Sequence, residues 1–319
     1  MSFPELHKNF LQSPAWQRVN QYIGHQAELR RIKNVEYLAI VKSAKRGRYL
    51  EIPGGPVMNW GDKELVQLVF SDIKAFAKST HCAFVRLRPQ LLHTPENLQL
   101  LSSLGLRIAP MHLHAENTIL IDLTQTEAEL LASLRRQTRY EVRRADKLQL
   151  VVKKSTSEAM FKEFFQVQQD TAKRQHFIPP SLNELLAEHK AFKKQAVIYT
   201  AYNPESEPIA YGLILKQYDE ADYFEAASTE LNRKLPGAYA IQWQVIRDLK
   251  AEGYRYYNLW GIAPKGAEHH RYAKVTTFKT GFGGQIVNFV PAHDLVVSKV
   301  KYLPDLMIES ARKKYRHLG

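Results

Sequence analysis

The amino-acid sequence predicts an α/β protein of two tandem domains, each built around a mixed β-sheet. Its 319 residues exceed one ordinary small domain and suit two domains of about 150 residues. Strand-like and helical periodicities are mixed along the chain, and the same kinds of element restart in the second half without a low-complexity linker. We therefore predict domains at residues 1–145 and 146–319, tightly packed with a cleft between them.

Apolar or alternating runs predict four strands in the first half, at Tyr37–Val41, Tyr49–Ile52, Ala83–Leu87 and Thr118–Leu123. A helical pattern over Asp62–Lys78 lies between the second and the third of these strands. Gly54-Gly55-Pro56 predicts a tight turn, because glycine allows unusual backbone angles and proline fixes φ.

The second half repeats this mixture of elements. Helices are predicted at Ser157–Gln175, Ser181–Phe192, Gly237–Glu252 and, with Lys and Arg near its end, Ser298–His317. Strands are predicted at Ala196–Tyr202, Ile209–Gln217, Asp222–Ala227 and Tyr254–Trp260. A polar loop at Pro264–Arg271 follows the last of these strands.

The composition indicates a folded protein with polyanionic partners. Hydrophobic residues make up 45% of the chain and charged residues 24%, which argues against disorder and fibrous architecture. The formal net charge of +13 favours tRNA, phosphorylated precursors or an anionic membrane surface as partners. The single cysteine, Cys82, lies in an apolar run and predicts an inert buried thiol. The sequence shows no signal peptide and no long apolar run, so we expect a cytoplasmic location.

The most basic segment begins at Glu127, where Thr126 or Thr124 can cap a helix. Arg139, Arg143 and Arg144 on this helix could bind phosphate, since guanidinium pairs with phosphate oxygens in a bidentate way. A solvated helix face is an equally good interpretation.

The segment Arg233-Lys234-Leu235-Pro236-Gly237-Ala238 opens a predicted helix directly after a strand. Unpaired N–H groups and the helix dipole favour an anion at such a place, so Arg233 is a candidate phosphate ligand. In the acetyltransferase fold, a similar loop holds the pyrophosphate of coenzyme A. The spacing here differs by one residue and includes a proline, which argues against coenzyme A.

Six segments resemble the Fem family of peptidoglycan-bridge aminoacyltransferases and follow the family's order. They are Phe10–Trp16, Ile52–Val57, Leu134–Lys147, Thr171–Pro179, Ala240–Ile262 and Phe278–Gly284. The resemblance implies two acetyltransferase-like (GNAT-type) domains. It also implies transfer of an amino acid from aminoacyl-tRNA to the side-chain amine of a muramyl pentapeptide, lipid-linked or UDP-linked. The long helical arm of many relatives has no room here, because a strand follows Phe192 almost at once.

Aminolysis of an ester needs a neutral amine, a stabiliser for the oxyanion and a route for the proton, with no metal or cofactor. Lys279 matches the lysine that the family places against the aminoacylated acceptor end of the tRNA, where a fixed cation can stabilise developing negative charge. Glu225, a polar residue in an apolar strand, is the candidate base, although an exposed strand face is an equally good interpretation. Tyr223 on that strand is a candidate substrate contact. Some relatives carry Asp-Pro where this sequence has Arg88-Pro89, so a carboxylate base is missing there. Arg174 either binds precursor phosphate or closes a salt bridge between domains.

Several alternatives remain beside this interpretation. His269, His270 and His176 lack ligand spacing, so we expect no metal site. An acyl-CoA-dependent N-acyltransferase and a non-catalytic RNA-binding protein are the rival functions. We expect a monomer, with peripheral contact between the basic C-terminal segment and the inner face of the membrane.

Overall fold

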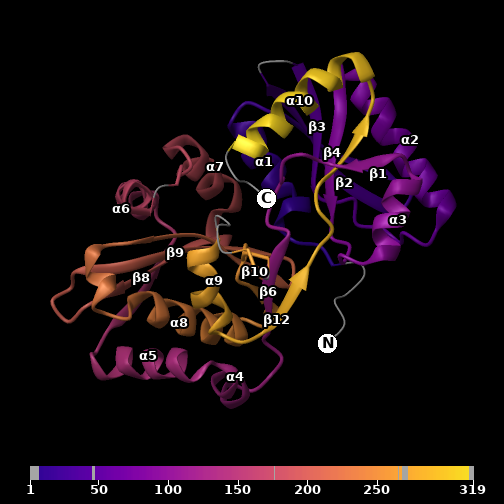
Figure 1. The fold of residues 1–319 in the computed structure, drawn as a ribbon. Helices are drawn as coiled ribbons and strands as arrows, with labels where there is room; N and C mark the ends of the chain where they lie inside the picture. Colours follow the sequence, from indigo (N-terminus) through magenta and orange to yellow (C-terminus); the bar gives the residue numbers. More distant parts are fainter. Residues whose placement is uncertain (1–6, 45–46, 176, 265, 268–271, 316–319) are drawn as a thin grey trace. The chain divides into compact units, whose positions relative to one another are not determined.

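The computed structural model describes residues 7–44, 47–175, 177–264, 266–267 and 272–315 (Figure 1). The chain forms two compact units. Unit 1 comprises Met1–Thr118, Gly261–Ala273 and Val287–Gly319, and unit 2 comprises Ile119–Trp260 and Lys274–Ile286. This division differs from the predicted domains 1–145 and 146–319. The basic helix before residue 145 packs within unit 2, and a C-terminal strand returns to the sheet of unit 1.

Unit 1 contains a mixed six-stranded sheet in the order β1-β2-β3-β4-β13-β5. Its strands are β1 (Gln26–Ile32), β2 (Val35–Ala44), β3 (Gly47–Gly54), β4 (Cys82–Pro89), β5 (Leu106–Ile108) and β13 (His293–Val296). Its helices are η1 (Phe10–Gln12), α1 (Pro14–Tyr22), α2 (Lys63–Ser79), α3 (Pro95–Ser103) and α10 (Lys299–Tyr315). Only β3 and β4 pair in parallel, because α2 connects them as a crossover.

Helices pack on both faces of this sheet. Successive side chains along β2 and β4 point to opposite faces and so belong to two separate layers. Tyr37, Ala39, Val85 and Leu87 belong to the main core together with apolar residues of α2. The intervening side chains, such as Leu38 and Ile40, pack against Trp16 of α1 on the other face. This period of two is the pattern that predicted the strands.

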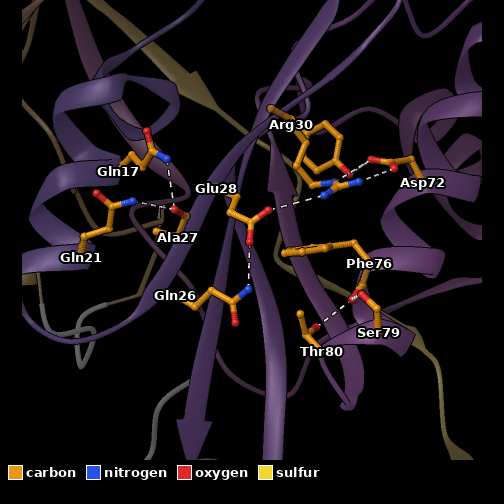
Figure 2. A network of polar contacts seen from close by, with 11 residues as sticks. Gln17, Gln21, Gln26, Ala27, Glu28, Arg30, Asp72, Phe76, Ser79 and Thr80 are labelled. Carbon is orange, nitrogen blue, oxygen red and sulfur yellow. Dashed lines mark hydrogen bonds and ion pairs between the residues drawn. The ribbon is translucent and has the colours of Figure 1, made fainter.

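A partly buried polar contact fixes the edge strand β1 to α2 (Figure 2). Arg30 donates two hydrogen bonds to Asp72, of 2.8 Å from Nε and 2.6 Å from Nη2, and its guanidinium lies 4.3 Å from the ring centroid of Phe76. The Tyr37 hydroxyl donates a third bond to Asp72, of 2.6 Å. These contacts hold the pKa of Asp72 below its usual value, with the Arg30 hydrogen bond as the largest cause. Strand β1 was not predicted because charged residues interrupt its apolar pattern.

The C-terminal helix α10 docks on unit 1 through an ion-pair network. Arg86 of β4 donates to both oxygens of Asp294 on β13, at 2.7 and 2.8 Å, and to both oxygens of Glu309 on α10, at 3.2 and 2.7 Å. Tyr302 of α10 packs edge-on against Phe84, with ring centroids 5.2 Å apart. Residues far apart in the sequence therefore complete one layer.

Unit 2 contains a seven-stranded sheet in the order β12-β6-β11-β10-β9-β8-β7. The strands are β6 (Asn117–Asp122), β7 (Val151–Ser155), β8 (Ala196–Tyr202), β9 (Pro208–Gln217), β10 (Glu220–Ser228), β11 (Tyr256–Asn258) and β12 (Gln285–Asn288). Helix α8 (Gly237–Ala251) packs on one face with α5 (Arg136–Lys147) outside it, and α6 (Glu158–Gln175) and α7 (Leu182–Phe192) cover the other face (Figure 1). The predicted repeat of one mixed α/β architecture is thus confirmed.

The predicted basic helix is broken into α4 (Glu127–Ser133) and α5. Thr126 caps α4 in a capping box with Glu129, as one of the two predicted alternatives. Leu134 and Arg135 are extended, and the Arg135 N–H donates to the Gly281 carbonyl at 2.9 Å. This tertiary bond explains the break, which helical periodicity alone could not reveal.

Cys82 is buried, and burial raises the pKa of its thiol, as expected for an inert cysteine. In the part of the chain that the structure describes, no helix combines the length and hydropathy needed to cross a bilayer.

We predict that Asp72→Asn lowers the free energy of unfolding by about 1–3 kcal/mol at neutral pH, because two charge-assisted hydrogen bonds are weakened. Since the pKa of Asp72 is depressed in the folded state, this difference should disappear as the pH falls through that lowered pKa. Urea unfolding at several pH values measures it. Glu28→Gln is the control, because the exposed Glu28 lies 3.6 Å from the same arginine. Equal effects of the two changes would contradict the prediction.

Candidate active site

The central strands of unit 2 separate at a fork. Strands β10 and β11 pair in parallel only from Glu220–Asp222 to Tyr256–Asn258, and a register shift between Tyr223 and Glu225 bends β10 away. We call the fork the segment Tyr223–Glu225 together with Leu259 and Trp260. The carboxyl ends of neighbouring parallel strands are the usual place for ligands in α/β sheets.

Helix α9 (Ala273–Thr280) brings Lys279 to this fork. Phe278 and Phe282, on either side of Lys279, pack against Tyr239 of α8 with ring centroids 5.0 and 5.9 Å apart, and 5.2 Å from one another. The aromatic cluster fixes the rotation of α9. Lys279 Nζ consequently lies 5.8 Å from the ring centroid of Tyr223 on β10.

The glycines that follow Lys279 allow α9 to lie close to its neighbours. A Cβ on Gly281 would come within 2.2 Å of the Thr138 hydroxyl of α5. Gly283 and Gly284 have φ of +74° and +79°, and a Cβ on Gly284 would come within 2.8 Å of the Leu120 carbonyl of β6. The sequence segment Phe278–Gly284 therefore acts as one structural device that positions Lys279.

The electrostatic state of Lys279 is unusual. The residue is 8% exposed, and burial lowers the pKa of its ammonium to about 7. The sequence-based hypothesis treated Lys279 as a fixed cation. The structure instead gives a group that is divided between its charged and neutral forms near neutral pH.

Glu225 lies half-buried on the face of β10 that α6 and α7 cover. It accepts a 2.7 Å hydrogen bond from Gln168 Nε2 of α6. Burial raises its pKa to about 7, against the opposing effect of Gln168. Glu188 of α7 is fully buried nearby, and burial, followed by the charge of Glu225, raises its pKa well above the usual value. The predicted candidate base is therefore a carboxyl with a neutral-range pKa.

Sequence reasoning missed Asp222, the last residue of β10 that pairs with β11. It has no exposed surface. Burial, followed by the charge of the neighbouring Glu220 and a hydrogen bond to it, raises the pKa of Asp222 well above its usual value, which favours the neutral form. An aspartate inside an apolar strand was the available signal.

Tyr223, the predicted substrate contact, is 8% exposed, and Gly212 leaves space beside its ring. Tyr256 and Tyr257 are buried in the core.

Arg174 ties elements of unit 2 together. Its Nη2 donates to the Ser228 carbonyl at the end of β10 and, at 3.3 Å, to Thr171. Its Nε lies 3.0 Å from Glu230. The predicted salt bridge between domains is therefore wrong, because all these partners belong to unit 2.

Two of the other predicted arginines, Arg139 and Arg144, have hydrogen-bond partners outside α9. Arg139 donates to carbonyls at the end of α4, the shortest bond being 2.9 Å to Ala132. Arg143 is exposed. Arg144 pairs with Glu141 and donates to the Lys234 carbonyl at 2.8 Å.

The loop before α8 is already partly occupied by its own side chains. Arg233 is exposed and pairs with Glu230 at 3.1 Å. The Ala238 N–H at the start of α8 donates to Asn232 Oδ1 at 3.1 Å, so one of the donors that a pyrophosphate would use is engaged. This contact agrees with the sequence argument against coenzyme A.

Across the described ranges, no three His, Cys, Asp or Glu side chains gather in a metal-binding group. His176, His269 and His270 lie outside the described residues, as does part of the predicted loop Pro264–Arg271.

Comparison with known proteins gives consistent family and fold assignments. A model of the FemAB family matches residues 2–203 and 180–309. The aminoacyltransferase FemA of Staphylococcus aureus (strain MW2) is 30% identical over 83 residues, which are 26% of this chain and 20% of that relative. The chain thus matches about a fifth of the length of this curated relative.

The crystal structure of FemX superposes with a TM-score of 0.84 at 15% identity, covering 97% of this chain and 99% of that one. The structure of L-PGS from Bacillus licheniformis gives 0.59 at 12% identity and covers 97% and 99%. A tandem GNAT protein from the clavulanic acid biosynthesis pathway gives 0.52 at 7% identity, covering 83% and 79%. These matches confirm the predicted tandem acetyltransferase-like fold.

We predict that Lys279→Met stabilises the protein below pH 7. The pKa of Lys279 is 10.5 in the unfolded chain and about 7 in the folded one. This difference destabilises the folded state by roughly 3–5 kcal/mol at a pH where the lysine is protonated in both states. The penalty is full below pH 7 and disappears as the pH rises towards 10.5. Chemical unfolding between pH 6 and 10 measures this convergence. Lys194→Met, at an exposed position, serves as the control. A variant less stable than wild type at every pH would contradict the prediction.

Proposed function

Because this chain belongs to the FemAB family, we propose that it is an aminoacyltransferase that moves an amino acid from aminoacyl-tRNA to the side-chain amine of a peptidoglycan stem peptide. The product would be the first or a later residue of an interpeptide bridge. No covalent enzyme intermediate is needed, since the ester of aminoacyl-tRNA is already activated.

The observation that carries this proposal is the position of Lys279. The segment Phe278–Gly284 holds this buried lysine beside Tyr223 at the fork of β10 and β11. Retaining a buried lysine lowers folding stability, so a functional role is the physical reason to keep it.

The reaction forms a C–N bond and breaks the ester C–O bond. The neutral acceptor amine attacks the ester carbonyl, and the carbonyl oxygen becomes an oxyanion. Protonated Lys279 stabilises this developing charge, and the ribose oxygen leaves with its electron pair and takes up a proton. Glu225, with a pKa of about 7, accepts the proton that the attacking amine releases.

The partners in this proposal are aminoacyl-tRNA and a muramyl pentapeptide that carries a diphosphate. Both are polyanions, and the net charge of +13 favours their approach. Exposed Arg143 and the loop that carries Arg233 are the candidate contacts for phosphate in unit 2. Arg139 and Arg174 would contribute by fixing α4 and the end of β10.

We further propose that α10 binds the cytoplasmic membrane surface, which favours a lipid-linked acceptor. One face of α10 docks on unit 1 through Tyr302 and Glu309. The opposite face exposes Val300 by 83%, Leu303 by 52% and Met307 by 71%. These residues recur at helical spacing and are flanked by exposed lysines, which is the pattern of a helix that lies in an anionic interface.

A transfer assay tests the proposed function. Purified protein, total bacterial tRNA charged with mixed amino acids, and lipid-linked or UDP-linked muramyl pentapeptide are combined, with each component omitted in turn. We expect a mass gain on the pentapeptide that requires charged tRNA. Transfer from acetyl-CoA in place of charged tRNA would support the rival acyltransferase function, and RNA binding without transfer would support the other rival.

In this assay we predict that Lys279→Met lowers kcat by about 10²–10³-fold, as for loss of an oxyanion stabiliser. Lys279→Arg should retain part of the activity and extend it to higher pH, because its guanidinium stays protonated. Glu225→Gln should lower kcat by about 10²-fold or more, since an amide cannot accept the proton. Unchanged kcat in Glu225→Gln would remove Glu225 from the mechanism, and the exposed-site variant Lys194→Met controls for loss of charge.

Membrane binding makes a separate prediction. The double change Leu303→Glu and Met307→Glu should reduce co-sedimentation with phosphatidylglycerol-containing vesicles by at least about tenfold, because buried apolar area and charge attraction are both lost. Leu68→Glu on α2, also at an exposed leucine, is the matched control. Equal binding of wild type and double variant would show that α10 does not make the contact.

A further inference from the structure

Unit 1 has its own parallel strand pair, and Arg88 lies at its end. Strands β3 and β4 run in parallel to Gly54 and Pro89, and Arg88 pairs in register with Pro53. Unit 2 places its fork at the end of the corresponding pair, β10 and β11. The architecture of the two units is repeated, so the strand ends of unit 1 are a second position suited to a ligand.

Arg88 is buried without a counter-charge in hydrogen-bond contact. Its exposed fraction is 1%, and its buried Nε and Nη1 have no hydrogen-bond partner in the part of the chain that the structure describes. Its guanidinium carbon lies 5.1 Å from the ring centroid of Phe289. A cation–π contact does not replace the five hydrogen bonds that a guanidinium can donate.

Arg86 shows how this chain satisfies a structural arginine on the same face of the same strand. Two residues before Arg88, it donates four hydrogen bonds to Asp294 and Glu309. Among the described residues, two carboxylates therefore accept hydrogen bonds from Arg86, and none accepts one from Nε or Nη1 of Arg88.

The acidic residue with the main electrostatic effect on Arg88 is Glu116, which already has other partners. One of its carboxylate oxygens lies 2.7 Å from His112 Nδ1 and accepts a 3.3 Å bond from the Ala292 N–H. Among the described residues, Glu116 makes no hydrogen bond to Arg88, although the negative charge of Glu116 raises the pKa of Arg88.

Burial lowers the pKa of Arg88 to about 10, against the opposing effect of Glu116. The guanidinium is thus still protonated at neutral pH. A buried charge without hydrogen bonds is unfavourable by several kcal/mol unless an anion compensates it. Planar carboxylates and phosphates are the groups that a guanidinium binds best.

We propose that Arg88 is an anion receptor at the β3–β4 strand ends, which binds an oxyanion of the acceptor substrate. The identity of that substrate rests on the proposed function. The oxyanion is either a carboxylate of the stem peptide or a phosphate of the diphosphate. Because only 1% of Arg88 is exposed, we expect a small oxyanion to reach its guanidinium and a bulkier part of the ligand to be excluded.

Thermal unfolding of the full chain tests the anion site without the reaction. Wild type, Arg88→Met and Arg48→Met are compared in sodium chloride, sodium acetate and sodium phosphate at equal ionic strength. Arg48 is an exposed arginine on β3 and serves as the matched control. We expect acetate or phosphate to raise Tm in wild type and Arg48→Met but not in Arg88→Met.

In chloride, we expect Arg88→Met to be as stable as wild type or more so, because it removes an uncompensated buried charge. An equal rise in Tm for all three proteins in the oxyanion salts would overturn the proposal. So would a marked loss of stability of Arg88→Met in chloride, since that would indicate a structural arginine. Arg88→Gln, which keeps a polar side chain, provides a second variant if the methionine variant does not fold.

Calorimetric titration then distinguishes the two sources of the oxyanion. Free stem pentapeptide carries carboxylates without phosphate, and UDP-N-acetylglucosamine carries a diphosphate without carboxylate. We expect Arg88→Met to weaken binding of one of them about tenfold to a hundredfold, as for loss of a charge-assisted hydrogen-bond pair. Unchanged binding of both, or binding of neither by wild type, would overturn the assignment to the acceptor.

The transfer assay separates this inference from the proposed function. A wild-type protein that transfers no amino acid but shows the Arg88-dependent rise in Tm would contradict only the proposed function. A wild type that transfers, with an Arg88→Met variant of unchanged KM for the acceptor, would contradict only the role of Arg88.

Discussion

The burial of ionisable groups at the ends of two parallel strand pairs is the constraint on which this structure depends. Water is excluded from both places, and a buried charge without a partner is unfavourable. Each ionisable group there is therefore expected to form an ion pair, to lose its charge or to bind a ligand of opposite charge. Arg86 is paired, burial favours the neutral form of Asp222, and Nε and Nη1 of Arg88 have no hydrogen-bond partner among the described residues. The three residues show the three solutions within one protein. The first connects β4 to β13 and α10, while burial of the other two makes the folded state less stable.

Near the fork of unit 2, burial brings opposite kinds of group to similar acidity. Lys279 and Glu225 would differ by several pKa units in water, yet burial moves both to about 7. A lysine and a carboxyl with matched pKa values can each hold or release a proton at little free-energy difference. Acyl transfer to an amine needs both events, so this matching suits the proposed reaction.

Sequence periodicity predicted the elements whose apolar residues face one core. Strand β8 and helix α7 follow their predicted ranges closely, because a continuous apolar run defines the strand and a capping serine the start of the helix. Strand β1 could not be predicted in this way, since an edge strand carries charged residues such as Arg30. The break before α5 depends on the bond from Arg135 to Gly281, which are 146 residues apart. The resemblance of Phe278–Gly284 identified Lys279, but only the fold reveals its lowered pKa and the raised pKa of Asp222.

Strand β13 gives unit 1 a particular order of assembly. It lies between β4 and β5 in the sheet, although about 200 residues separate it from β4 along the chain. During synthesis, the strands β4 and β5 therefore leave the ribosome long before the strand that joins them. The residues of unit 2 are complete by Ile286, ahead of β13. Unit 2 can thus mature first, and a nascent chain arrested before residue 293 would expose an open edge on β4, which is a template for aggregation.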